Sequence, residues 1–105
     1  MARPYTADIA GGTATVTIQI QERQTLKQAL VSWVPTAAAK LELSTSPTSQ
    51  IGTAQPTADV QLRLTGSATA AGANIVPIPI NIPVVAFQSI YVHTTGAGLG
   101  SVTLS

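Results

Sequence analysis

Apolar and polar residues alternate with a period of two along much of the chain. Between residues 13 and 21, the apolar positions are Ala14, Val16, Ile18 and Ile20, and Thr or Gln occupies the positions between them. This alternation is typical of a β-strand with one buried face. The same reasoning predicts further strands at residues 26–34, 40–44, 59–65, 74–85, 87–94 and 101–104.

The predicted strand at 26–34 is apolar on both of its faces. Regular alternation places Leu26, Leu30 and Val34 on one face, and Ala29, Val31 and Trp33 on the other. Two interpretations follow from this pattern. Either the strand lies in the core and is buried on both sides, or Val31 and Trp33 belong to an exposed apolar patch that serves as an interface.

The predicted strand at 74–85 combines an unbroken apolar face with three prolines at odd positions, Pro77, Pro79 and Pro83. Alternate residues of a strand direct their N–H groups toward the same neighbour, so these prolines remove hydrogen-bond donors from a single edge. Such a strand can pair on one side only, which predicts that it lies at the edge of a sheet. The prolines either protect that edge against aggregation or form a rigid rim that faces a neighbouring subunit.

About seven short strands separated by turn-forming residues predict an all-β chain. We expect a single antiparallel β-sandwich, either jelly-roll-like or immunoglobulin-like, because periodicity does not reveal strand order. We assign residues 1–12 to an N-terminal arm and residues 13–105 to the sandwich domain. The sequence leaves open whether residues 1–12 and 45–56 are ordered without a partner.

Composition and charge narrow the functional classes. Charged residues make up 9% of the chain and the formal net charge is +1, so we expect neither nucleic acid nor a membrane as a partner. The chain has no cysteine, which excludes disulfides and cysteine-based metal sites. We find no signal peptide and no apolar segment long enough to be a membrane helix, and we therefore expect synthesis in a cytoplasm.

Few side chains could carry catalytic chemistry. The chain has a single histidine, His93, and no G-x-S-x-G nucleophile motif, so we expect a structural or surface role for this residue. Four carboxylates are present: Asp8, Glu22, Glu42 and Asp59. We interpret them as solvated charges of strand faces and turns rather than as a glycosidase pair or a calcium site. We therefore expect no enzymatic activity, no cofactor, no metal and no small-molecule substrate.

The segment from Gln88 to Ser105 has a distinctive pattern: an aromatic residue, a valine and one variable residue, then Thr-Thr-Gly-Ala-Gly, then a final short strand. Together with the Thr-, Ala- and Gly-rich, cysteine-free composition, this ending resembles small virion proteins of tailed bacteriophages. The resemblance implies a structural virion protein, most directly a capsid decoration (cement) protein that binds the phage head surface and stabilises it. A tail, neck or fibre component is an alternative.

The resemblance also implies partners. These are the major capsid protein and further copies of the chain itself, commonly as a homotrimer, with the virion as the location. A carbohydrate-binding or cell-surface-binding module that uses Trp33 and Tyr91 is a further alternative. The residues that we expect at an interface are Trp33, Val31, Pro77, Pro79, Pro83 and Tyr91.

Overall fold

The computed structural model describes residues 5–9, 13–35, 39–52, 58–65, 74–96 and 98–105. These residues form eight strands and no helix, and so no helix that could span a membrane. The strands are β1 (Tyr5–Ile9), β2 (Ala14–Gln19), β3 (Gln24–Pro35), β4 (Lys40–Ser44), β5 (Val60–Thr65), β6 (Asn74–Val84), β7 (Ser89–Thr95) and β8 (Gly98–Leu104). The all-β prediction is confirmed, with one strand more than the sequence indicated.

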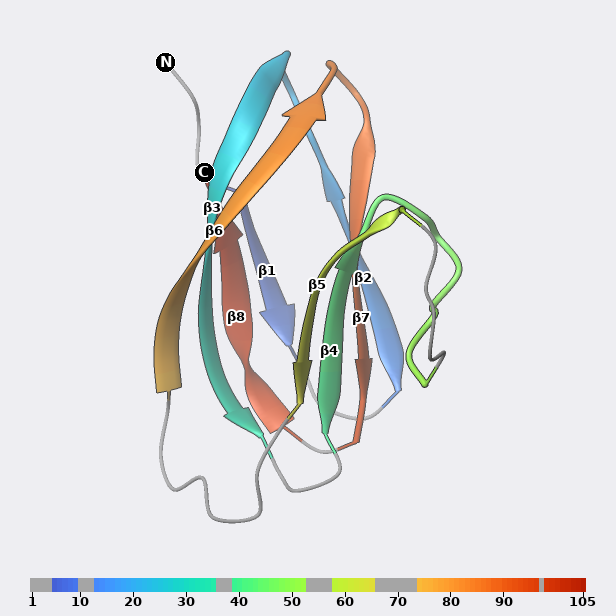
Figure 1. Cartoon of the computed structure of the whole chain (residues 1–105), viewed down its shortest axis with the longest axis vertical. Coiled ribbons are helices and arrows are strands. Elements are labelled where there is room, and N and C mark those ends of the chain that lie inside the picture. Colours follow the sequence, from blue (N-terminus) through green and yellow to red (C-terminus); the bar gives the residue numbers. More distant parts are fainter. Residues whose placement is uncertain (1–4, 10–12, 36–38, 53–57, 66–73, 97) are drawn as a thin grey trace.

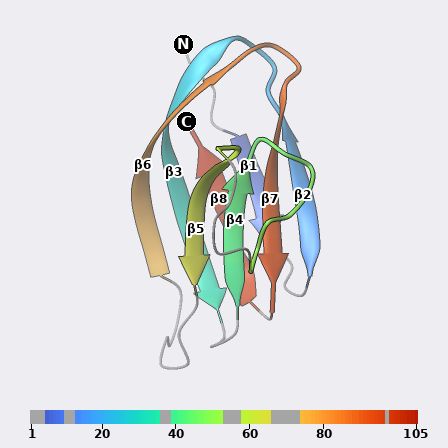
Figure 2. The ribbon, with the colours of Figure 1, turned by 45° about the vertical axis from the view of Figure 1, so that its right-hand side comes forward.

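The strands form two four-stranded antiparallel sheets that pack face to face (Figures 1 and 2). The first sheet has the order β1-β8-β3-β6, and the second has the order β2-β7-β4-β5. Strands β1 to β4 pair in turn with strands β8 to β5, as in one long antiparallel hairpin that has its tip between β4 and β5. The successive pairs β1–β8, β2–β7, β3–β6 and β4–β5 belong alternately to the first and the second sheet. A hairpin rolled up in this way is a jelly roll, so the strand order decides between the two expected topologies.

Strand β1 corrects the prediction of an N-terminal arm. Residues 5–9 pair along their whole length with β8, from Tyr5 opposite Leu104 to Ile9 opposite Gly100. The side chains of Ala7 and Ile9 are each 4% exposed and belong to the core. Residues 5–9 are therefore part of the sandwich, while residues 1–4 and 10–12 lie outside the described part of the chain.

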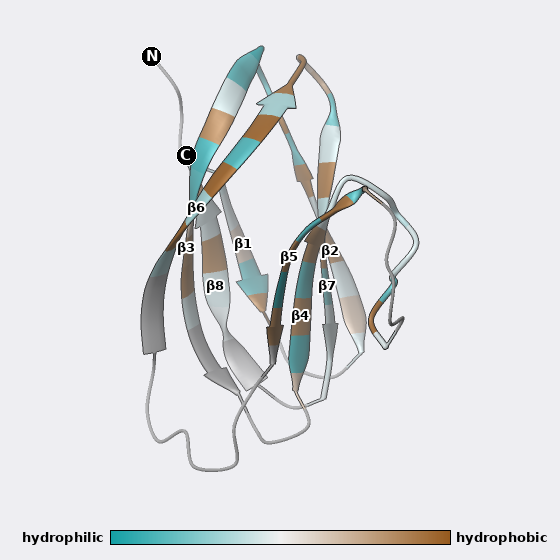
Figure 3. Ribbon diagram, viewed as in Figure 1, coloured by the Kyte–Doolittle hydropathy of each residue, from teal (hydrophilic) through white to brown (hydrophobic). Residues whose placement is uncertain are grey.

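The core lies between the two sheets and consists of the inward apolar residues of the strands. Figure 3 shows apolar and hydrophilic residues alternating along β4 and β5. The most completely buried apolar side chains are Ile20, Leu26, Ala29, Leu43, Ile90, Val92, Val102 and Leu104. Apolar burial of this kind is the main favourable term for a small domain that has no disulfide.

A β-bulge interrupts the alternation of β3. The backbone N–H groups of Lys27 and Gln28 both donate to the carbonyl of Ser105, at 2.7 and 2.9 Å. The register between β3 and β6 shifts at the same place. Two residues opposite one is the defining pattern of a bulge, and both bulged side chains are exposed.

The bulge corrects the expected arrangement of apolar residues on β3. Because Lys27 and Gln28 both point outward, Leu26 lies on the same side as Ala29 and Val31, and all three side chains are at most 1% exposed. Leu30 points outward and is half-buried. Burial on both sides of the strand, which the sequence suggested, is therefore wrong for the described side chains.

Strand β6 lies at an edge of the first sheet, as its prolines predict. Its neighbour among the described strands is β3, which pairs with it from Gln24 opposite Val84 to Trp33 opposite Asn74. The inward side chains of Ile82 and Val84 are buried, whereas Pro77, Pro79 and Pro83 are exposed. Proline is tolerated at an edge because its missing N–H can face away from the sheet.

Replacing Leu26 and Leu30 separately tests the bulge. We expect Leu26→Ala to lower the free energy of unfolding by about 2–5 kcal/mol, because a fully buried leucine leaves a cavity. Leu30→Ala is expected to lower it by about 1 kcal/mol or less, because the side chain is half-buried on the outer face. Chemical denaturation measures both values. Equal losses would contradict the bulge, since regular alternation places the two leucines on one face.

Candidate interaction face

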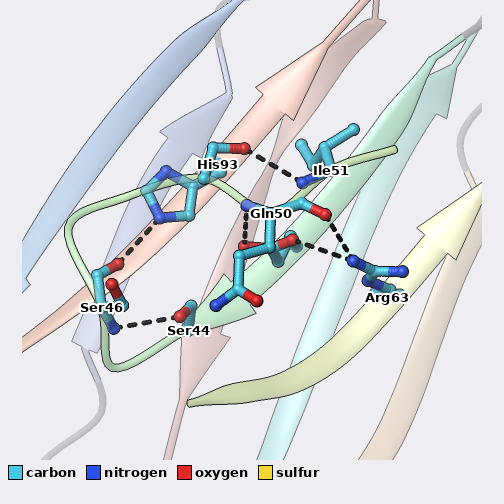
Figure 4. A network of polar contacts seen from close by, with 8 residues as sticks. Ser44, Ser46, Gln50, Ile51, Arg63 and His93 are labelled. Atoms are coloured by element: carbon cyan, nitrogen blue, oxygen red, sulfur yellow. Dashed lines mark hydrogen bonds and ion pairs between the residues drawn. The ribbon is translucent and has the colours of Figure 1, made fainter. Parts of the chain in front are cut away.

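The outer face of the second sheet is covered in part by the chain itself, over β4 and β7. Residues 45–52 follow β4 and lie over the outward side chains of β4 and β7 (Figure 4). Glu42 and Ser44 are 0% exposed and His93 is 1% exposed, although all three are polar. Buried polar groups require hydrogen-bond partners. The covering segment supplies several of them.

His93 forms hydrogen bonds through both of its ring nitrogens, one to this segment and one to β2. Nε2 lies 2.9 Å from the carbonyl oxygen of Ser46, and Nδ1 lies 2.8 Å from Oγ1 of Thr15. Since a carbonyl can only accept, we assign the proton to Nε2, and the neutral ring then accepts a hydrogen bond from the Thr15 hydroxyl at Nδ1. The Tyr91 ring lies parallel to the imidazole, with centroids 6.1 Å apart. The imidazole therefore joins β7, β2 and the covering segment.

Glu42 forms the second attachment. Its Oε1 accepts a hydrogen bond of 3.1 Å from the backbone N–H of Gln50. Its Oε2 lies 3.8 Å from Nη2 of Arg63, whose guanidinium also donates to the Gln50 carbonyl. Oε2 accepts no hydrogen bond within the described structure, so its charge is balanced mainly by the partly exposed Arg63. The expectation that Glu42 is a solvated charge is wrong, while Asp8, Glu22 and Asp59 are exposed as expected.

The outer face of the first sheet is different because it is open to solvent. One row of outward residues crosses all four strands, from Thr6 through Thr103 and Leu30 to Pro77. We define the uncharged face as the outward, exposed or half-buried residues Thr6, Leu30, Ser32, Pro77, Pro79, Ser101 and Thr103. Charged side chains among the described outward residues of this sheet are Asp8 on β1 and Lys27 in the bulge.

The uncharged face has the character of a protein contact surface. Charged residues are depleted at the centre of protein interfaces, because each buried charge must lose its water. The side chains of this face are short or rigid, and the hydroxyls of Thr6 and Thr103 already bond to each other at 3.1 Å. A partner that covers this face loses little hydration energy of charges and little side-chain entropy.

The residues that the sequence singled out do not form one site. Pro77, Pro79 and Pro83 lie together on β6, at one margin of the first sheet. Tyr91 is half-buried on the second sheet beside His93. Val31 is 1% exposed in the core, so its assignment to an exposed patch is wrong. Trp33 is part of β3, but its side chain lies outside the described structure.

The turn between β6 and β7 differs from the sequence-based expectation. Alternation predicts that a strand starts at Phe87, whereas β7 begins at Ser89 and Phe87 lies in the preceding turn with 70% exposure. Val85, in the same turn, is 56% exposed. One signal was present in the sequence, because the adjacent pair Val84-Val85 breaks the period of two.

Removing the imidazole tests whether His93 holds the covering segment. We expect His93→Phe to lower the free energy of unfolding by about 1–3 kcal/mol, since the Ser46 carbonyl loses its partner. Amide hydrogen exchange should accelerate in residues 45–51 and stay slow at Ile90 and Val92. Thr15→Val is the matched control, because it removes the Nδ1 partner only and leaves the bond to Ser46. Unchanged exchange in residues 45–51 of His93→Phe would refute this role.

No protein-family model, no curated protein and no solved structure matches the chain. Within the described residues, no group of three or more His, Cys, Asp or Glu side chains is placed to hold a metal ion. The open, uncharged face of the first sheet is the candidate functional site because it has the character of a protein contact surface.

Proposed function

We propose that this chain is a structural virion protein of a tailed bacteriophage, a capsid decoration (cement) protein that binds the head surface and stabilises it. The observation that carries the proposal is the contrast between the two outer faces. The chain's own residues 45–52 cover the part of one face that β4 and β7 form, and the other face is open and almost free of charge. An open face of this kind suits a broad contact with another protein.

The rigidity of this face supports a structural role. Its side chains stand on four hydrogen-bonded strands, and β8 and β3 lie in the interior of the sheet. Threonine, serine and proline have few rotamers to lose when they are covered. A surface that is already in its binding conformation uses more of its contact energy for affinity. A protein that reinforces a shell benefits from such a rigid contact.

Self-association into a homotrimer belongs to the proposal, as the resemblance to phage virion proteins implies. A formal net charge of +1 gives little repulsion between copies. The prolines of β6 restrict how copies can meet, because Pro77, Pro79 and Pro83 have no N–H to donate to an added strand. We therefore expect the copies to meet through side chains, without joining their sheets at β6.

A charge placed on the uncharged face tests the proposal. Thr103 points outward on the first sheet, and Thr17 points outward on the second sheet at an exposed position. Phage heads are prepared without this protein, the purified protein is added to them, and the bound protein is measured after sedimentation. Thr103→Lys should weaken binding by about tenfold or more, because an unpaired charge is then buried in the contact. Thr17→Lys is the matched control and should bind as the wild type does.

The outcomes separate the candidate functions. Equal binding by wild type and Thr103→Lys would show that the uncharged face is not the contact surface. Wild-type protein that binds tails or fibres but not heads would favour the tail, neck or fibre alternative. Wild-type protein that is monomeric by light scattering and binds no part of the particle would refute a virion role. Binding to glycans instead would favour the carbohydrate-binding module.

A further inference from the structure

The turn between β6 and β7 presents two large apolar side chains to solvent. Val85 is 56% exposed and Phe87 is 70% exposed, and both lie in the short connection between β6 and β7 (Figure 1). Scattered exposed apolar residues are common on protein surfaces. Two such residues within one tight turn, including the chain's single phenylalanine, form a compact projection that we call the Phe87 knob.

Phe87 holds a backbone conformation that glycine adopts more easily. Its φ is +66°, which lies in the left-handed region. That region is uncommon for residues with a side chain and is a true outlier for bulky ones. Because most of the ring is exposed, its contacts within the chain offset little of this strain. Glycine would therefore serve the fold of this turn at least as well as phenylalanine does.

Hydrogen bonds nevertheless hold the turn firmly. The N–H of Phe87 donates to the carbonyl of Ile20 at 2.7 Å, and the N–H of Ile20 donates to the carbonyl of Gln88 at 2.8 Å. Within the turn, Val85 N–H donates to the Gln88 side chain at 3.1 Å. Ile20 is 0% exposed, so these bonds connect the knob to the core. The aromatic ring is thus presented on a preorganised support.

We propose that Phe87 is the anchor of the contact with the phage head and inserts into an apolar pocket of a head-shell protein. This inference rests on the proposed function. The turn follows directly after β6, whose exposed Pro83 lies on the outer face of the first sheet, so the knob lies at one end of the edge strand that borders the proposed contact surface. Aromatic residues that fill a partner's pocket commonly dominate the binding energy of such contacts.

The size and charge of the knob argue against other occupants. A phenylalanine buries about 150–250 Å², whereas a specific interface buries about 1,000 Å² or more. Two knobs from two copies would therefore be too small to form a dimer by themselves. The loop bonded to the turn carries Glu22 and Arg23, whose charges cancel. An anionic membrane surface would be attracted by a cluster of basic residues instead.

The test compares Phe87→Gly and Phe87→Asn with the wild type. Glycine and asparagine both tolerate the left-handed conformation, so both variants keep the turn while they remove the ring. Affinity for heads that lack the protein should fall by about thirtyfold or more, which is the range for an aromatic anchor. The midpoint of unfolding should stay near that of the wild type. Phe87→Leu, which keeps an apolar side chain, should retain part of the affinity.

Each result of this experiment either supports or overturns the role of Phe87 as the anchor. Loss of binding at wild-type stability supports the anchor. Wild-type affinity in Phe87→Gly and Phe87→Asn overturns the anchor and leaves the proposed function standing. A loss of stability as large as that of Leu26→Ala in both variants overturns it too, because Phe87 would then support the fold. Failure of the wild-type protein to bind heads overturns the proposed function together with the anchor.

Discussion

The hydrogen bonds that Lys27 and Gln28 both donate to the carbonyl of Ser105 decide which side of β3 faces the core. Without this bulge, Leu26 would lie on the opposite side of the strand from Ala29 and Val31. One half of the longest strand would then bury polar side chains. With the bulge, both halves bury their apolar residues, and the outer face of the first sheet keeps Leu30 among short polar residues and prolines. The outward positions of Leu30 and Ser32 follow from the regular alternation of the half of β3 that comes after the bulge, and those of the other residues of the uncharged face follow from β1, β6 and β8.

The two sheets of the jelly roll differ in what covers their outer faces. The second sheet places Glu42, Ser44 and His93 outward, and residues 45–52 cover them with hydrogen bonds from the backbone. The first sheet has no polar network of this kind in the described residues, and its outer face stays accessible. A partner on the first sheet would take the place that the covering segment takes on the second. The Phe87 knob, at the end of β6, adds a specific anchor to that broad contact.

Period-two alternation was sufficient to predict the fold class, most of the strands and the edge position of β6. These features depend on local sequence, namely on which side chains share a face and which residues lack an N–H. The jelly-roll order was not predictable in this way, because it depends on pairing between distant strands such as β1 and β8. Strand β1 was missed because its alternation spans five residues and includes a small alanine.

The errors in predicting which side chains are buried and which are exposed have a common physical cause. The bulge in β3 depends on hydrogen bonds to the carbonyl of Ser105. The burial of Glu42 depends on a segment that folds back over β4. Neither arrangement leaves a periodic signal in the sequence. The exposure of Phe87 likewise depends on bonds between its turn and Ile20. Local patterns predict the face of a residue within a strand, and tertiary contacts decide what covers that face.

The proposed virion role implies that a phage encodes the chain, and its most direct test is quantitative mass spectrometry of purified, intact particles of that phage. A decoration protein repeats with the head lattice, so we expect the chain at a fixed molar ratio to the major capsid protein, in many copies per particle. The ratio should be the same in independent preparations. Absence of the chain from washed particles, or its presence in trace amounts that vary between preparations, would contradict the account.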